Sequence, residues 1–197
     1  MLLGRQQYFI KERVGLLKLV DTYDILEPEN QQRIGLAKEE PPTWIKLLGF
    51  LINKQMLPTR VNVYEEGQAA PIFYISRGFT FLRSKIMVIG PGGTPVGYFK
   101  SKLFSLGGGF FVFDMQDRQV AEVKGDWKGW NFKFLGQNGA ELGVVTKKWA
   151  GLAKEFFTSA DQYLISLNEA APATEGAGVL LLAAGLAIDI VFKEQGG

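Results

Sequence analysis

The segment that most restricts how this chain can fold is an uncharged run near its end, residues 176–188. These thirteen residues are apolar on every side of a helical wheel, and the first charge after them is Asp189. A helix without a polar face has to be surrounded by lipid or by protein. A bilayer span takes about 20 apolar residues, whereas a run of about 10–14 is more typical of a buried core helix. We therefore favour burial in protein, and the question becomes what surrounds the helix.

Length and composition predict one domain over residues 1–197, since 197 residues that are 47% hydrophobic can bury a sizeable core. The net charge of +2 is too small for a dedicated nucleic-acid binder. Residues 79–158 nevertheless hold eleven Lys and Arg against six Asp and Glu, a surplus of five. This surplus indicates either a basic face for phosphates and anionic lipid headgroups or a set of ordinary solvated strand faces.

The chain contains neither cysteine nor histidine. Thiol nucleophiles, imidazole bases and the usual zinc and iron ligand sets are thereby excluded, so we expect no enzyme and no cofactor. Residues 1–7 hold no apolar stretch long enough for a signal peptide. The expected location is therefore the cytoplasm, with peripheral attachment to the inner face of the membrane as a further expectation.

One hairpin pattern recurs along the chain: an apolar strand, a polar turn, and a return strand that begins with an aliphatic residue. The return strands begin at Ile34-Gly35, Ile72-Phe73, Val96-Gly97, Val120-Ala121 and Leu142-Gly143. Short, evenly spaced strands with Gly, Asn and Asp turns predict an antiparallel meander that closes into a sandwich or barrel. With residues 8–13 and 162–167 the total is about twelve strands. Alternation is clearest at Trp130, Phe132 and Phe134, which share one face.

Two segments depart from the strand pattern. Residues 43–56 read as a helix, with Thr43 as its N-cap and Pro58 after its end. The second predicted helix covers residues 176–193. A barrel of about twelve strands is too wide for its own side chains to fill, so a slim apolar helix would fit as its plug. The expected fold is mainly β, a closed antiparallel barrel around a central hydrophobic C-terminal helix.

Several motifs, taken in order, resemble those of the phospholipid scramblase family and its tubby C-terminal-like and LURP-one-related relatives. The motifs are Tyr8-Phe-Ile-Lys-Glu-Arg, Tyr23-Asp-Ile with Ile34-Gly, Gly97-Tyr-Phe-Lys, Phe157-Thr-Ser-Ala-Asp and Leu186-Ala-Ile-Asp-Ile-Val-Phe-Lys-Glu. The similarity covers nearly the whole chain. Residues 104–110 and 123–130 look like those of bacterial scramblase-like proteins in particular.

The resemblance implies a twelve-stranded tubby-like barrel around a hydrophobic helix, with phospholipids as the partner class. Animal scramblases are associated with calcium-dependent lipid movement between leaflets, and tubby domains bind phosphoinositides. The acidic calcium-binding segment of the animal proteins corresponds here to residues 161–169, whose only acids are Asp161 and Glu169. Calcium takes six to eight oxygen ligands, so we expect no calcium site. Without cysteine, no palmitoyl anchor can form either.

Eight basic residues are candidates for a surface that binds lipid headgroups. They are Arg83, Lys85, Lys100, Lys102, Lys124, Lys128, Lys147 and Lys148. Each basic residue near an anionic membrane contributes on the order of 1 kcal/mol, so several together could recruit the protein. Strand alternation could instead scatter them over the barrel. Trp127 is the candidate for the membrane interface, where tryptophan is favoured, whereas the strand phase turns Trp130 toward the core.

Asp189 and the loop at residues 90–95 each allow two interpretations. A buried acid could gate or coordinate a ligand, or it could be structural, paired with a barrel Arg or Lys or with backbone amides. The Gly-Pro-Gly-Gly-Thr-Pro loop resembles a phosphate cradle but lacks the Gly-Lys-Ser/Thr ending of a P-loop, and a hairpin turn explains it.

The favoured function is that of a scramblase-like protein that binds or redistributes membrane phospholipids without covalent chemistry. Its expected partner is an anionic phospholipid membrane surface, not a nucleic acid. The alternative is a soluble scaffold or regulatory module that binds a protein or an acidic ligand on the barrel surface, since fold does not determine function.

Overall fold

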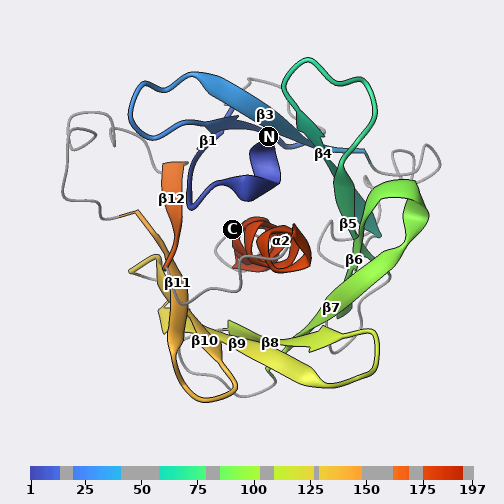
Figure 1. Ribbon diagram of the computed structural model, residues 1–197, viewed down its shortest axis with the longest axis vertical. Coiled ribbons are helices and arrows are strands. Elements are labelled where there is room, and N and C mark those ends of the chain that lie inside the picture. Colours follow the sequence, from blue (N-terminus) through green and yellow to red (C-terminus); the bar gives the residue numbers. More distant parts are fainter. Residues whose placement is uncertain are drawn as a thin grey trace, which may run out of the picture.

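Within its described residues, the computed structural model is a closed barrel of twelve antiparallel strands (Figure 1). The structure describes residues 1–13, 20–40, 58–78, 85–102, 109–126, 129–147, 162–168 and 175–192. The strands are β1 (Gln7–Glu12), β2 (Thr22–Leu26), β3 (Arg33–Glu39), β4 (Thr59–Glu65), β5 (Phe73–Arg77), β6 (Lys85–Ile89), β7 (Pro95–Ser101), β8 (Gly109–Asp114), β9 (Gln119–Asp126), β10 (Asn131–Gly136), β11 (Glu141–Thr146) and β12 (Gln162–Leu167). Each strand pairs with its neighbours in the sequence, and β12 closes the ring on β1. The expected mainly β barrel is confirmed.

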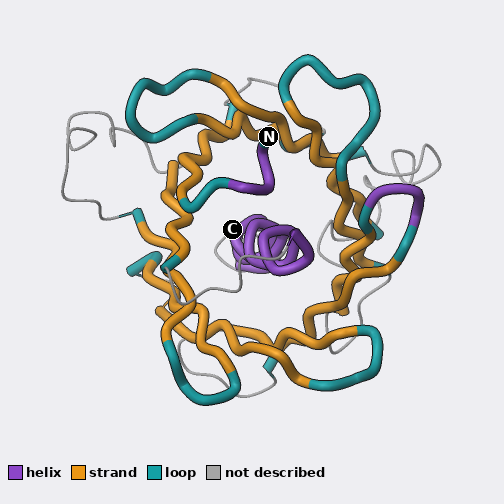
Figure 2. The backbone as a smooth tube through the Cα atoms, viewed as in Figure 1, coloured by secondary structure: helices purple, strands orange, loops and turns teal. Residues whose placement is uncertain are grey.

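Helix α2 (Glu175–Phe192) passes through the centre of the barrel (Figure 2). Its alanine and leucine residues are strong helix formers. Leu182, Ala183, Ala187 and Ile188 are each 0% exposed, so the helix is surrounded by protein on all sides there. The all-round apolar pattern of the sequence therefore marks a plug buried in the barrel, as expected.

The strands alternate between the lumen and the outside, as a half-buried sheet must. On β10, Phe132 and Phe134 are buried against the core, whereas Asn131 and Lys133 are exposed. Trp130 packs against the same core, edge-on to Phe132 and tilted over Tyr163. The predicted inward phase of Trp130, Phe132 and Phe134 is thus confirmed.

A β-bulge lies at the return strand of four of the five repeated hairpins. The register shifts occur opposite Ile34, Val96, Val120 and Leu142, which are the aliphatic residues that the repeat singles out. A bulge adds one unpaired residue and increases the local twist of the strand. Each of these four side chains packs against the core, and the next residue, Gly or Ala, is buried. The sequence repeat therefore corresponds to a repeated bulge.

The 3-10 turn η1 (Leu2–Gly4) lies inside the ring beside α2 (Figure 1). Leu2 is 1% exposed, and its backbone N–H donates to Oε1 of Glu65 at 2.6 Å. The Tyr8 hydroxyl donates to the carbonyl oxygen of Leu2 at 3.1 Å. A Cβ added at Gly178 of α2 would lie 2.7 Å from the carbonyl oxygen of Leu3, so turn and helix are in close contact.

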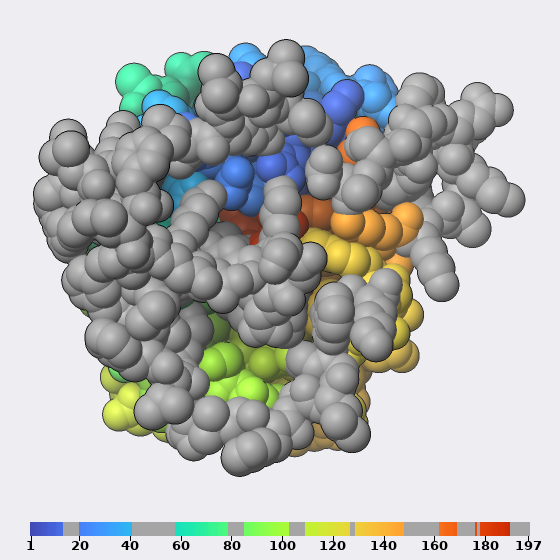
Figure 3. All heavy atoms as spheres, turned by 180° about the vertical axis from the view of Figure 1, so that it is seen from behind, coloured from blue at the N-terminus to red at the C-terminus, as the bar shows by residue number. Residues whose placement is uncertain are grey.

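Five short hairpins distinguish one end of the barrel from the other. The short hairpins at residues 27–32, 66–72, 90–94, 115–118 and 137–140 all lie at one end, here called the hairpin end (Figure 2). The opposite end, where β1 finishes and β2 begins, is here called the far end. The predicted helix at 43–56 lies outside the described residues. α2 begins next to η1 at the hairpin end. In the view from behind, its red atoms lie near the centre of the molecule (Figure 3).

Candidate functional site

Five of the eight predicted basic residues lie in the described part of the chain, and all five are at the far end of the barrel. Because neighbouring strands are antiparallel, β6, β8 and β10 begin at the end where β7, β9 and β11 finish. Lys85 opens β6, while Lys100 and Lys102 lie at the end of β7. Lys124 is near the end of β9, and Lys147 directly follows β11. We call Lys85, Lys100, Lys102, Lys124 and Lys147 the basic rim. Arg83, Lys128, Lys148 and Trp127 lie outside the described residues.

Lys85 and Lys100 are direct neighbours on the outer face, since they are register partners between β6 and β7. Like charges directly opposite each other destabilise a sheet, so this pair has an energetic cost in the free protein. Neither ammonium group makes an ion pair with a carboxylate in the described ranges. A bound anion between the two would therefore be stabilised by both.

The two lysines lie over a pair of stacked aromatic rings on the outside of the barrel. The Nζ atom of Lys85 is 3.9 Å from the ring centroid of Tyr98, and that of Lys100 is 5.9 Å from the ring centroid of Phe113. The two rings stack with centroids 5.0 Å apart. The Tyr98 hydroxyl donates to Oδ1 of Asp117 at 2.7 Å, and this hydrogen bond raises the pKa of Tyr98. Cation–π contacts hold the ammonium groups over this aromatic floor.

The other three lysines of the basic rim differ in how far their charge is compensated. Lys102 is ion-paired with Glu122, and its Nζ lies 4.7 Å from the ring centroid of Phe111. Lys147 lies 4.0 Å from the ring centroid of Trp130. Lys124 is exposed and makes no ion pair with any described carboxylate. The charge available to an outside anion thus comes mainly from Lys85, Lys100 and Lys124.

The aromatic floor was not predicted from the sequence. Phe110, Phe111, Val112 and Phe113 form a continuous apolar run, whose lumen-facing and outward-facing members look alike. Only the register shows that Phe110 and Val112 face the lumen, while Phe111 and Phe113 face outward beside the lysines. The signal that could have indicated this is the length of the run, because a strand buried on one face needs only alternate apolar residues.

Asp189, the other candidate, lies at the far end of the lumen and is 5% exposed. The hydroxyl of Tyr23, on β2, is hydrogen-bonded to its carboxylate. Burial and, next, the charge of Asp189 raise the pKa of both Tyr23 and Tyr163 well above the usual value for tyrosine. A hydroxyl that donates to a buried carboxylate satisfies it at least in part, which supports the structural role. Among the described residues, no group of three acidic, His or Cys side chains is placed to hold a metal ion.

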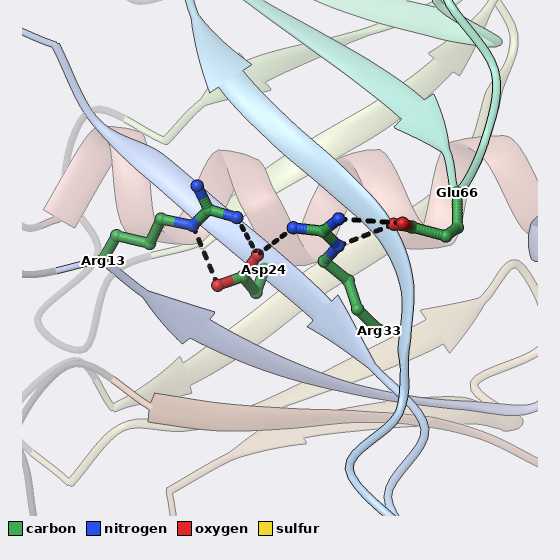
Figure 4. Close-up of polar contacts among 4 residues, drawn as sticks. All are labelled: Arg13, Asp24, Arg33 and Glu66. Carbon is green, nitrogen blue, oxygen red and sulfur yellow. Dashed lines mark hydrogen bonds and ion pairs between the residues drawn. The ribbon is translucent and has the colours of Figure 1, made fainter.

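A further polar cluster consists of Arg13, Asp24, Arg33 and Glu66 (Figure 4). Asp24 lies on β2 and Arg33 on β3, whereas Arg13 directly follows β1 and Glu66 directly follows β4. Arg13 donates to both carboxylate oxygens of Asp24, at 2.9 and 2.6 Å. Arg33 donates to both oxygens of Glu66, at 2.6 and 2.8 Å, and lies 3.8 Å from Asp24. Hydrogen bonding from Arg33 lowers the pKa of Glu66. Since these charges compensate one another, the cluster joins strands and is not a ligand site.

No helix in the described ranges combines the length and the apolar character that crossing a membrane requires. A search of curated proteins and a search of solved structures return no match. The model of one protein family, Scramblase, matches residues 22–195. This match runs from the first residue of β2 past the end of α2, and so includes eleven of the barrel strands, the basic rim and the plug. The chain that forms this helix-filled barrel is therefore a member of the Scramblase family.

Proposed function

We propose that the protein binds anionic phospholipid membranes from the cytoplasmic side, with the basic rim on the lipid headgroups. The observation that carries this proposal is the pair of neighbouring lysines, Lys85 and Lys100, held over aromatic rings without a carboxylate partner among the described residues. Membership of the Scramblase family supports phospholipid as the partner class.

The chemistry of the rim matches a phosphate headgroup. An ammonium group is a compact point charge that binds phosphate oxygens without demanding one geometry. The aromatic floor of Tyr98 and Phe113 holds the two ammonium groups on the outer wall through cation–π contacts. Binding of this kind needs no covalent step and no metal ion. Any redistribution of lipids by the protein would follow passively from such binding.

Flotation of the purified protein with vesicles tests the proposal. We expect the protein to float with vesicles that contain phosphatidylserine, but not with pure phosphatidylcholine, and to be released by high salt because exposed charges are screened. The double variant Lys85→Gln/Lys100→Gln should bind anionic vesicles more weakly by about 2 kcal/mol, or roughly thirtyfold.

The matched control is Arg33→Gln/Arg118→Gln, which removes the same charge at the hairpin end, where both arginines are ion-paired. Thermal melts of all variants establish that they are folded. Equal binding by the two double variants would contradict a role for the rim. A parent protein that fails to float at any salt concentration would instead favour a soluble module that binds a protein or an acidic ligand on its surface.

A further inference from the structure

We infer that the barrel stands on the membrane end-on, with its far end toward the lipid and its hairpin end away from it. This inference rests on the proposed function, because it states the geometry of that binding. It is drawn from the way charge is distributed along the barrel axis.

Exposed basic groups at the far end are not confined to the basic rim. Lys11 lies near the end of β1 and is exposed. Arg60 lies near the start of β4, also exposed, with its guanidinium carbon 4.5 Å from the ring centroid of Tyr74. β1 finishes at the far end and β4 begins there. Lys11 and Arg60 therefore extend the cationic set from the β6–β11 wall to the other side of the ring. A ring of cations around one end favours contact through that end over contact through one wall.

Carboxylates at the far end are largely engaged. Glu39 is buried and accepts a hydrogen bond from the hydroxyl of Thr59. Glu40 is ion-paired with Lys38 at 3.0 Å, and Glu122 is ion-paired with Lys102. Asp126 is the exposed carboxylate at the end of β9. Among the described residues of this end, exposed basic side chains therefore outnumber exposed carboxylates.

The hairpin end has the opposite character. Its arginines are used in ion pairs: Arg5 with Glu27, Arg33 with Glu66, and Arg118 with Asp114. Glu29 is exposed and makes no ion pair with a described residue. Among the described residues, the carboxylate of Asp117 accepts a hydrogen bond from the hydroxyl of Tyr98 and makes no ion pair. The remaining turn residues are mostly Gln, Asn, Gly and Pro. An anionic membrane would repel this end and attract the other, which sets the orientation.

Single fluorescent labels test the orientation, because the chain contains no cysteine and each introduced thiol is unique. Asn131→Cys places a label at the far end, at the exposed first position of β10. Gln116→Cys places one in the turn between β8 and β9, on the same wall but at the hairpin end. Ala69→Cys places a third in the hairpin between β4 and β5. Each labelled protein is bound to phosphatidylserine vesicles with a quencher on the acyl chains.

We expect the label at residue 131 to shift to shorter wavelength and to be quenched, while those at 116 and 69 stay unchanged. Quenching at both 131 and 116 would show side-on binding through the β6–β11 wall and overturn the inference. Quenching at 116 and 69 alone would show the reverse orientation and overturn it as well. Absence of flotation for the unlabelled parent would overturn the proposed function instead, so the two failures are distinguishable.

A second variant pair gives an independent readout. Lys11→Gln/Arg60→Gln removes two cations from the far end but from the wall opposite the basic rim. End-on binding predicts that this double variant loses affinity for anionic vesicles roughly as strongly as Lys85→Gln/Lys100→Gln does, about thirtyfold. Affinity equal to that of the parent would mean that only one wall touches the membrane, contrary to the inference.

Discussion

Two buried tyrosines at the far end of the lumen differ in whether their hydroxyl group has a hydrogen-bond partner. The Tyr23 hydroxyl is hydrogen-bonded to the carboxylate of Asp189. Tyr163 is 1% exposed, and its hydroxyl has no hydrogen-bond partner in the described part of the protein. A buried polar group without a partner loses its hydration and gains nothing in exchange. The two residues therefore should respond oppositely to removal of the hydroxyl.

We expect Tyr163→Phe to leave the free energy of unfolding unchanged or to raise it by about 1 kcal/mol, because the ring contacts remain and an unsatisfied hydroxyl is removed. Tyr23→Phe, the matched control, should lower the free energy of unfolding by about 1–3 kcal/mol, because the charged carboxylate of Asp189 loses a hydrogen bond. Urea unfolding of both variants measures the difference. A larger loss for Tyr163→Phe than for Tyr23→Phe would contradict this assignment.

At the scale of the element, helix α2 is fitted to the barrel by its small residues. A Cβ at Gly185 would lie 2.8 Å from Cγ1 of Ile165, on β12, which is too close for real atoms. Gly176, in the first turn of the same helix, is exposed and has open space around it. At Gly185 the helix thus approaches β12 at a position that has no room for a side chain.

We expect Gly185→Ala to destabilise the protein by about 1–2 kcal/mol, because the overpacking near Ile165 outweighs the gain in helix propensity. Gly176→Ala should stabilise it by up to about 1 kcal/mol, since the same gain comes without a clash. Thermal or urea unfolding compares the two. Equal stabilisation by both changes would mean that α2 is not packed against β12.

The strands and the plug could be predicted from the sequence because their signals are local. In a helix that is apolar on all sides, and in alternating strands such as residues 130–134, a few neighbouring residues are enough to indicate which side chains are buried. The outward aromatic floor could not be predicted, because it depends on which residues are cross-strand partners. Lys85 and Lys100 become neighbours only through the register between β6 and β7. This register brings two of the candidate residues together. Asp189 was a candidate from the sequence, but its partner Tyr23 was not identified there.

At the scale of the whole molecule, charged groups contribute to stability in a manner that depends on pH. Hydrogen bonding from Arg33 lowers the pKa of Glu66, so folding favours the ionised form of this carboxylate. A group whose pKa is lower in the folded state contributes stability above its unfolded pKa. That contribution is lost as pH falls through the folded pKa. The network in Figure 4 should therefore weaken in acid.

We expect the urea midpoint of the parent to fall as pH drops from about 5 toward 3, and Glu66→Gln to reduce this dependence because the titrating group is gone. Glu29→Gln is the control, since Glu29 is an exposed carboxylate outside every ion pair of the described residues. It should leave the slope as in the parent. An identical pH dependence in the Glu66→Gln variant would show that the Arg33 pair contributes nothing measurable.

The central position of α2 also has a consequence for the order in which the molecule can assemble. Strand β1 is synthesised first, but its partner β12 and the helix that fills the lumen follow about 150 residues later. Chains dominated by such non-local contacts fold slowly, and their exposed apolar strand faces are prone to aggregation until the partners arrive. All twelve strands leave the ribosome before the residues that complete their core. The barrel can therefore close around a filled lumen only after α2 has been synthesised.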